Sequence, residues 1–142
     1  MTETTQGSCF CGAVQVQVAG PALLQGYCHC TSCRRWSVQP FIAYAMWPSD
    51  QVSIIAGQDS LAHIARNDDL TMHFCSACGG HIMAVSAKAG LTDVFPMQLQ
   101  DFDFTPAIHV NYGERVVDLP DGLPKFRDMP ARAGGSDEMI AE

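Results

Sequence analysis

Short runs in which apolar and polar side chains alternate are the main pattern along this chain. Over residues 14–18, three valines alternate with two glutamines, and Gly20 follows closely. A period of two is typical of a β-strand with one buried face. Residues 41–47 contain no charged side chain and end at Pro48, which favours a strand buried on both faces.

Further short strands are expected along the rest of the chain. They are predicted at residues 52–55, 61–66, 72–74, 81–85, 93–99, 108–110 and 115–117. Most are separated by turn residues, a spacing typical of an all-β sheet or sandwich. No long stretch has helical periodicity between caps, although residues 31–36 fit one turn. The predicted fold class is therefore mostly β, with antiparallel sheets and little helix.

The sequence predicts a single domain with short flanking segments. The 142 residues contain no internal repeat or linker, and a chain of this length buries a core of its own. Residues 131–142 combine glycine and charge with little bulk, so we expect a disordered tail there. Residues 1–6 are interpreted as an N-terminal arm, which leaves residues 7–130 as the folded domain.

The charge balance disfavours some classes of partner. Eight lysines and arginines stand against fifteen acidic residues, for a net charge of -7, which disfavours binding to nucleic acid. No apolar run approaches the roughly 20 residues of a membrane span, and the first residues lack the features of a secretory signal. We therefore expect a cytoplasmic protein without a membrane partner, in a compartment where thiols stay reduced.

Seven cysteines at short spacings carry most of the chemical information. They form a C-x-C pair, a C-x-C-x-x-C triplet and a C-x-x-C pair, made of Cys9, Cys11, Cys28, Cys30, Cys33, Cys75 and Cys78. Neighbouring cysteines in a tight turn supply two metal ligands at little cost in loop closure. Gly79 and Gly80, after the last pair, allow the positive-φ turn of a zinc knuckle.

Three other interpretations compete with a catalytic metal site. Disulfides are disfavoured by the odd number of cysteines, the reducing compartment and the poor geometry of cysteines one residue apart. An iron–sulfur cluster would need the usual four-cysteine runs, which this sequence lacks. Purely structural zinc, holding together an inert β domain, remains open as the third interpretation.

We expect two zinc ions per chain. The pairs Cys9–Cys11 and Cys75–Cys78 would supply four thiolates to a closed structural site. The triplet would hold a second ion through three protein ligands and leave its fourth position for water or a substrate. Because a thiolate-rich site favours a soft fourth ligand, we expect a substrate thiol there, activated for carbon–sulfur chemistry.

The same residues resemble the glutathione-dependent formaldehyde-activating enzyme (GFA) family. Its three motifs occur here in order: G-x-C-x-C-G at residues 7–12, C-H-C-x-x-C-R at residues 28–34 and F-C-x-x-C-G at residues 74–79. The resemblance continues through His109 and the Asp-Gly-Leu-Pro run at residues 121–124. One departure is Ser37-Val38, where members of the family often carry glycine at the second position.

The resemblance implies a mostly β, zinc-stapled fold with one structural four-cysteine zinc and one catalytic three-cysteine zinc at Cys28, Cys30 and Cys33. It also implies a carbon–sulfur lyase, similar to an S-(hydroxymethyl)glutathione synthase, that acts on a thiol–aldehyde adduct. Such a protein would bind a small thiol such as glutathione. Separately from the resemblance, we expect a monomer or homodimer. The alternative is a non-catalytic, zinc-stabilised module that binds thiols or other proteins.

Charged and aromatic-ring side chains near these motifs are secondary candidates. Arg34 and Arg35 follow the triplet, and a guanidinium matches a carboxylate, so they are candidate ligands for an anionic thiol. A solvated surface is the alternative for both. His29 is expected to form hydrogen bonds nearby instead of binding zinc. His81 and His109 either pack in the fold or close the second site as a fourth ligand.

Overall fold

The computed structural model describes residues 2–142 and shows a mostly β protein. The chain forms two compact units, each made of two separate stretches of sequence. Unit 1 consists of Met1–Leu24 and Ala45–Phe104, and unit 2 of Gln25–Tyr44 and Thr105–Glu142. Met1, the first residue of the expected N-terminal arm, lies outside the described residues.

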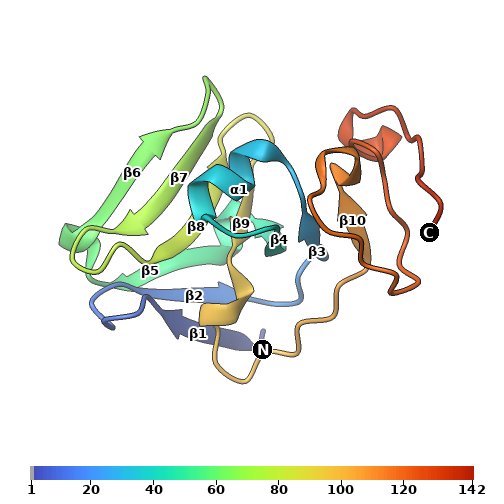
Figure 1. Cartoon of the computed structure of the whole chain (residues 1–142). Helices are drawn as coiled ribbons and strands as arrows, with labels where there is room; N and C mark the ends of the chain where they lie inside the picture. The colour runs from blue at the N-terminus through green and yellow to red at the C-terminus, as the bar shows by residue number, and fades with distance from the viewer. Residues whose placement is uncertain (1) are drawn as a thin grey trace. The chain divides into compact units, whose positions relative to one another are not determined.

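The first sheet of unit 1 is antiparallel. Its strands are β1 (Thr4–Ser8), β2 (Gln15–Ala19) and β5 (Val52–Ala56), in the order β1-β2-β5 (Figure 1). The alternation predicted for β2 is confirmed, because Val16 and Val18 are buried whereas Gln15 is exposed. β1 begins within the stretch interpreted as an arm and places Thr5 opposite Val18. Its polar sequence has no strand pattern, so pairing with β2 defines it.

The second sheet of unit 1 is also antiparallel. Its strands are β4 (Ile42–Pro48, in unit 1 from Ala45 on), β9 (Leu91–Val94), β8 (His81–Ser86), β7 (Leu70–Cys75) and β6 (Leu61–Ala65), in that spatial order. The strand predicted over residues 93–99 is wrong beyond Val94. Pro96 has no N–H for the ladder and begins a 3-10 turn instead.

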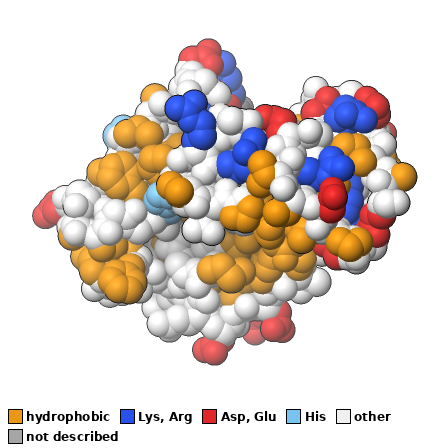
Figure 2. Space-filling model, in the orientation of Figure 1, with side chains coloured by type: hydrophobic (Ala, Val, Ile, Leu, Met, Phe, Trp, Pro, Cys, Tyr) orange, Lys and Arg blue, Asp and Glu red, His pale blue; other side chains and the backbone are white. Residues whose placement is uncertain are grey.

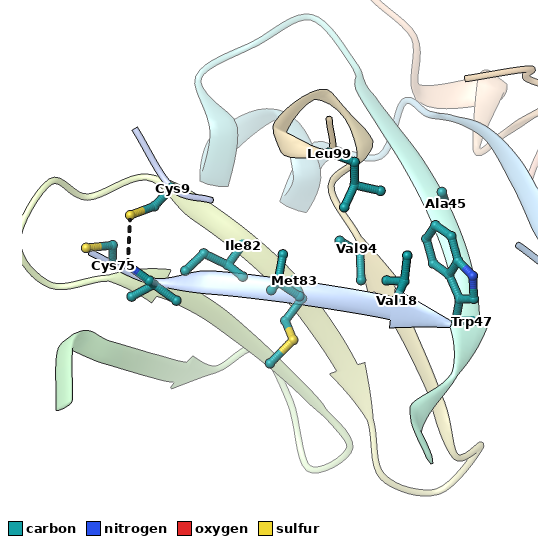
Figure 3. Close-up of a cluster of buried hydrophobic side chains, with 11 residues drawn as sticks. Cys9, Val18, Ala45, Trp47, Cys75, Ile82, Met83, Val94 and Leu99 are labelled. Atoms are coloured by element: carbon teal, nitrogen blue, oxygen red, sulfur yellow. Dashed lines mark hydrogen bonds between the residues drawn. The ribbon is translucent and has the colours of Figure 1, made fainter. Parts of the chain in front are cut away.

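The core of unit 1 packs around Trp47, which is fully buried on β4. The indole N–H donates to the Gly20 carbonyl oxygen at 3.0 Å, which satisfies the polar atom of the buried ring. Figure 3 shows the cluster of buried side chains extending from Trp47 to Cys9 and Cys75 at the other end. Close packing of this core therefore fixes the positions of two candidate metal ligands.

Unit 2 contains a short parallel strand pair. β3 (Leu24–Cys28, in unit 2 from Gln25 on) runs parallel to β10 (Ile108–Val110) and places Tyr27 opposite His109. The sequence did not predict β3, because Gly26 interrupts its apolar pattern. Glycine is needed there, since a Cβ atom would lie 2.6 Å from the carbonyl oxygen of Ile108. The register thus depends on a close approach of two backbones.

One α-helix and several 3-10 turns occur among residues 2–142. They are α1 (Thr31–Ser37), η1 (Ser49–Gln51), η2 (Gln58–Ser60), η3 (Pro96–Gln98), η4 (Tyr112–Glu114) and η5 (Ala131–Ala133). α1 confirms the helical turn predicted over residues 31–36. The strand predicted at residues 115–117 is wrong, and Arg115 pairs there with Asp118 at 2.6 Å. None of the described helices is long and apolar enough to cross a membrane.

The C-terminal segment, residues 113–142, makes defined backbone contacts within unit 2. The N–H of Ile140 donates to the carbonyl oxygen of Lys125 at 2.8 Å, and that of Arg127 donates to Glu138 at the same distance. Figure 2 shows acidic and basic side chains side by side over this part of the molecule. Residues 131–142, for which the composition predicts disorder, include η5 and several of these contacts.

Candidate functional site

Two clusters of cysteine sulfurs are each a candidate metal site. The first, in unit 1, consists of Cys9, Cys11, Cys75 and Cys78, and the second, in unit 2, of Cys28, Cys30 and Cys33. Within each cluster all sulfur atoms lie within 4.8 Å of one another. The spacing of the cysteines predicts this division into four and three. Both clusters are compatible with a bound metal ion.

Tight turns assemble the four-cysteine cluster. Cys9 and Cys11 lie in the loop between β1 and β2, whereas Cys75 ends β7 and Cys78 lies in the turn before β8. The glycines that follow Cys11 and Cys78 have φ values of 80° and 76°. The value at Gly79 confirms the positive-φ turn predicted after Cys78, and Gly12 adopts the same conformation, which other residues rarely do.

Backbone N–H groups stabilise two of these sulfurs as thiolates. Val14 donates to Cys9 Sγ at 3.3 Å, and Gly80 donates to Cys78 Sγ at 3.4 Å. The N–H of Cys11, followed by that of Gly80, lowers the pKa of Cys78 to about 6. Burial raises the pKa of Cys9, but the Val14 N–H and neighbouring thiols outweigh burial and lower it overall. Thiolate is the form that binds metal ions.

The sulfur separations of this cluster match a tetrahedral metal site. Cys11 Sγ lies 3.7 Å from Cys9 Sγ and 3.8 Å from Cys75 Sγ. Four sulfurs at about 2.3 Å from one ion would be about 3.8 Å apart. The Ala13 N–H lowers the pKa of Cys11, but loss of solvation and the neighbouring thiols raise it to about 11. A metal cation at the centre of the cluster would favour the thiolate form of each cysteine and so offset this rise in the pKa of Cys11.

The three-cysteine cluster forms where β3 leads into α1. Cys28 ends β3, Cys30 caps α1 and Cys33 lies in its first turn, and all three are buried. The sulfur of Cys30 accepts the N–H of Cys33 at 3.2 Å, so a ligand candidate also caps the helix. Asn111 Nδ2–H donates to Cys28 Sγ at 3.4 Å.

The sulfurs of this cluster lie close together, and the pKa is raised at two of them, Cys28 and Cys33. Cys33 Sγ lies 2.9 Å from Cys30 Sγ and 3.5 Å from Cys28 Sγ. Hydrogen bonds with Cys28 and Cys30, together with burial, raise the pKa of Cys33, and the hydrogen bond with Cys30 raises that of Cys28 to about 11. A bound metal ion would displace the thiol protons and widen the Cys30–Cys33 separation by about 0.9 Å.

No further histidine, cysteine or carboxylate among residues 2–142 joins these three sulfurs as a fourth donor. His81, on β8 of unit 1, and His109, on β10 of unit 2, both lie outside the two clusters. Among the described residues, neither histidine therefore lies where it could serve as the fourth ligand of the three-cysteine cluster. The two clusters differ in this respect, because only the first has a complete tetrahedral donor set.

His29 lies between two of the cysteines and forms hydrogen bonds away from the sulfurs, as the sequence predicts. Its Nε2 is 2.8 Å from His109 Nδ1, and His109 Nε2 is 2.7 Å from Asp121 Oδ2. Both histidine side chains are fully buried. Burial is the largest cause of a lowered pKa at His29, which falls to about 4. His29 is therefore neutral near pH 7.

Sequence reasoning missed a buried lysine at the end of this hydrogen-bonded chain. Lys125 is 1% exposed. Its Nζ donates to Asp121 Oδ1 at 2.8 Å, to the Leu123 carbonyl oxygen at 2.9 Å and to Glu142 Oε1 at 2.5 Å. Burial lowers the pKa of Lys125, but the two carboxylates outweigh it and raise the pKa. The lysine is paired well enough to stay charged inside the protein.

The two arginines lie on α1. Arg34 Nη2–H donates to Thr31 Oγ1 at 3.1 Å, and Thr31 in turn donates its hydroxyl and its N–H to Glu114 Oε1. Arg34 Nε is enclosed and has no partner among the described residues, whereas the Arg35 side chain is exposed. A role for either arginine in holding a substrate stays a prediction.

Residues 4–112 match the family model described as glutathione-dependent formaldehyde-activating enzyme. This match covers more than half of the chain and includes all seven cysteines. The chain therefore belongs to this family, as its cysteine motifs indicate. The C-terminal segment lies outside the matched region.

Two curated relatives carry related names. A Fusarium vanettenii protein, provisionally named as a glutathione-dependent formaldehyde-activating enzyme, is 30% identical over 74 residues. An uncharacterized lyase of Schizosaccharomyces pombe is 27% identical over 74 residues. Each alignment covers 52% of this chain, and they cover 40% and 52% of the two relatives. The chain thus spans about half or less of the length of these relatives.

A solved structure shares the fold. A crystal structure of a Rhodobacter sphaeroides protein matches with a TM-score of 0.58 and 21% sequence identity. The match covers 69% of this chain and 90% of that chain. The likeness confirms the mostly β fold predicted from the sequence, and at this level of identity it carries no conclusion about chemistry.

Proposed function

We propose that this protein is a zinc-dependent carbon–sulfur lyase, similar to an S-(hydroxymethyl)glutathione synthase, that acts on a thiol–aldehyde adduct. One observation carries the proposal: Cys28, Cys30 and Cys33 offer three sulfur donors with no fourth among the described residues, whereas the other cluster offers four. A closed set of four is typical of structural zinc, and an incomplete set of three is typical of catalytic zinc. Membership of the family supports the same reading.

The donor set fits zinc, because thiolates are among its preferred ligands and the three sulfurs converge to within 4.8 Å of one another. When bound, zinc would supply a Lewis acid that lowers the pKa of a substrate thiol. The protein holds and orients these sulfurs: the side-chain amide of Asn111 donates to the sulfur of Cys28, and the first turn of α1 positions Cys33. The burial of all three cysteines keeps bulk water away.

The reaction balances without an oxidant or a reductant. In the synthase direction the sulfur electron pair of the thiol forms a bond to the aldehyde carbon, and the π bond of the carbonyl group breaks. The thiol proton ends on the new hydroxyl group. In the lyase direction the carbon–sulfur bond breaks, and the hydroxyl proton returns to sulfur.

A small anionic thiol such as glutathione is the substrate class that we favour. Arg34 retains one N–H without a partner among the described residues, and Arg35 is exposed close by on the same helix. A guanidinium donates in the fork geometry that a carboxylate accepts. These two side chains are therefore the candidates to bind the carboxylates of such a thiol.

The second candidate is a non-catalytic module that zinc stabilises and that binds a thiol or another protein. The deep burial of the three-cysteine cluster, where no sulfur-bearing residue is more than 9% exposed, favours it. A cluster shielded from solvent in this way would hold a metal ion without exchanging its ligands. Catalytic turnover separates the two candidates.

The test is the rate at which the zinc-loaded chain forms and breaks S-(hydroxymethyl)glutathione from glutathione and formaldehyde, above the spontaneous rate. We expect acceleration by the wild-type protein and its loss in Cys30→Ser. Ser32→Ala is the matched control, because Ser32 is an exposed neighbour outside the cluster, and it should keep the activity. Binding of glutathione without acceleration would support the module and contradict the enzyme.

A further inference from the structure

A line of hydrogen-bonded side chains leads from the C-terminal segment to the three-cysteine cluster. Asp121 accepts from Lys125 through Oδ1 and faces His109 Nε2 through Oδ2, at 2.8 and 2.7 Å. His109 Nδ1 lies 2.8 Å from Nε2 of His29, the residue between two of the cysteines. All of these residues belong to unit 2. Each contact joins two nitrogens or oxygens that share one proton, so one end of the line constrains the other.

The carboxylate of Asp121 determines which nitrogen of His109 carries a proton. Asp121 accepts from the ammonium group of Lys125 and from the N–H of Leu123, at 2.8 and 3.1 Å. These donors favour the ionised form, which has no proton to give. His109 must therefore donate to Asp121 through Nε2–H.

Two arrangements remain for the contact between the histidines. If His109 is neutral, its Nδ1 accepts from Nε2–H of His29, and Nδ1 of His29 keeps a lone pair. If His109 is a cation, it donates to His29 and leaves a proton on Nδ1 of His29, which is buried without a partner among the described residues. A buried N–H without an acceptor is rarer than a buried acceptor without a donor, and a second buried cation near Lys125 costs solvation. The neutral arrangement is therefore favoured.

Aromatic packing holds both rings in place. Tyr112 packs edge-on against His29, with centroids 4.9 Å apart, and lies 5.4 Å from the His109 ring. Phe41 packs on His29 at 5.1 Å with an angle of 30° between the ring planes. Because both histidines are fully buried in this packing, neither ring can turn over to exchange its nitrogens without disrupting its neighbours.

We propose that Asp121, acting through His109, is a positioning residue that holds His29 with its proton on Nε2 and so orients the cysteines on either side of it. The backbone adds to this link, because the N–H of His29 donates to the carbonyl oxygen of Val110 at 3.1 Å. The C-terminal segment thereby supports a cluster that belongs to an earlier part of the chain. Because the proposal concerns only where these protons lie, it does not depend on the catalytic activity proposed above.

An Asp121→Asn substitution is expected to move the proton of each histidine to its other ring nitrogen. The amide oxygen would face the ammonium of Lys125, which can only donate, so the amide NH2 would face His109. His109 Nε2 would then accept, and both histidines would move their protons to Nδ1, as expected when an orienting carboxylate becomes an amide. We also expect zinc affinity at the three-cysteine cluster to fall about tenfold or more, since partners of this kind tune metal sites by that amount.

Long-range proton–nitrogen correlation spectra of the zinc-loaded, nitrogen-15-labelled full chain identify which nitrogen of each histidine carries the proton. We expect Nε2–H at His29 and His109 in the wild-type protein and Nδ1–H at both in Asp121→Asn. A proton on Nδ1 of His29, or a cationic His109, in the wild-type protein would overturn the proposal. Unchanged tautomers in the variant, or reversed tautomers with unchanged zinc affinity, would overturn it as well.

Asp118→Asn is the matched control. Asp118 lies in the same segment but pairs with Arg115 at the surface, so this variant should leave both histidines and the zinc affinity unchanged. Should Asp121→Asn fail to fold, the one-bond proton–nitrogen coupling of the proton shared by His29 and His109 in the wild-type protein identifies the nitrogen that carries it. Its attachment to His29 supports the proposal, and its attachment to His109 contradicts it.

Discussion

The side-chain amide of Asn111 donates to the sulfur of Cys28 across 3.4 Å and so joins the start of η4 to the three-cysteine cluster. Asn111 adopts a φ of 54°, in the left-handed region that asparagine tolerates better than most residues. One residue therefore satisfies a backbone turn and restrains a metal-ligand candidate at the same time.

Asn111→Gly tests this contact, because glycine keeps the left-handed turn and removes only the amide. We expect zinc affinity at the three-cysteine cluster to fall about tenfold, in line with the loss of other groups that orient metal ligands. The four-cysteine cluster should be unaffected. Competition with a chromophoric chelator measures both sites in one titration. An equal loss at both, or no loss at either, would contradict the assigned role.

The two clusters should respond differently to the loss of one sulfur. We expect Cys30→Ser to leave a folded protein without activity, because the second cluster orders only a short part of the chain. We expect Cys78→Ser to unfold unit 1, since that site ties together two distant loops and metal binding contributes folding free energy. Circular dichroism and metal content measure the two effects. Equal loss of folding in both variants would remove the distinction between a catalytic and a structural site.

Val38 ends α1 with a φ of 55° although valine is β-branched, and its side chain is 83% exposed. Glycine adopts the left-handed conformation without this strain. We expect Val38→Gly to raise the free energy of unfolding by about 1 kcal/mol, because the strain of the left-handed valine is lost. Val116→Gly is the control: this exposed valine lacks a positive φ. Urea denaturation should show stabilisation in the first variant and none in the second.

The pKa of Asp93 on β9 is raised to about 7 by burial, and its Oδ1 has no partner among the described residues. An unfolded aspartate has a pKa of about 3.9. The folded state therefore binds this proton more tightly, and stability should fall as the pH rises from about 4 to about 7. We expect Asp93→Asn to remove that slope and to add about 1–3 kcal/mol at pH 8, less than full burial would give because the residue is half-buried.

Denaturation at a series of pH values measures the contribution of Asp93. Asp59→Asn is the control, because Asp59 is exposed and the same chemical change there should leave the slope in place. A slope that persists in Asp93→Asn would show that another group produces it.

The cysteine clusters could be predicted from the sequence because their ligands lie at short spacings that only a shared ion explains. Cys9 and Cys11 are separated by one residue, as are Cys28 and Cys30. The strands β2 and β4 were predicted for a similar reason, since the alternating valines of β2 and the uncharged run of β4 are local patterns. A feature that depends only on residues close together in the sequence can be predicted without knowledge of the fold.

Other parts of the fold depend on contacts that the sequence does not reveal. β1 is polar and exists through its pairing with β2, and the expected strand around Asp93 stops where Pro96 removes a hydrogen-bond donor. His29 and His109 are 80 residues apart, so their contact has no local signal. Lysine is rarely buried, and nothing near Lys125 in sequence indicates that Glu142 will pair with it.

The most direct test of an open thiol-binding site is the visible spectrum of the cobalt-substituted chain, recorded with its metal content before and after addition of glutathione. Cobalt reports the type and number of its ligands. We expect two metal ions per chain, with the bands of one ion shifting as glutathione is added and those of the other unchanged. A single ion, or two ions whose bands ignore glutathione, would contradict an open three-cysteine site.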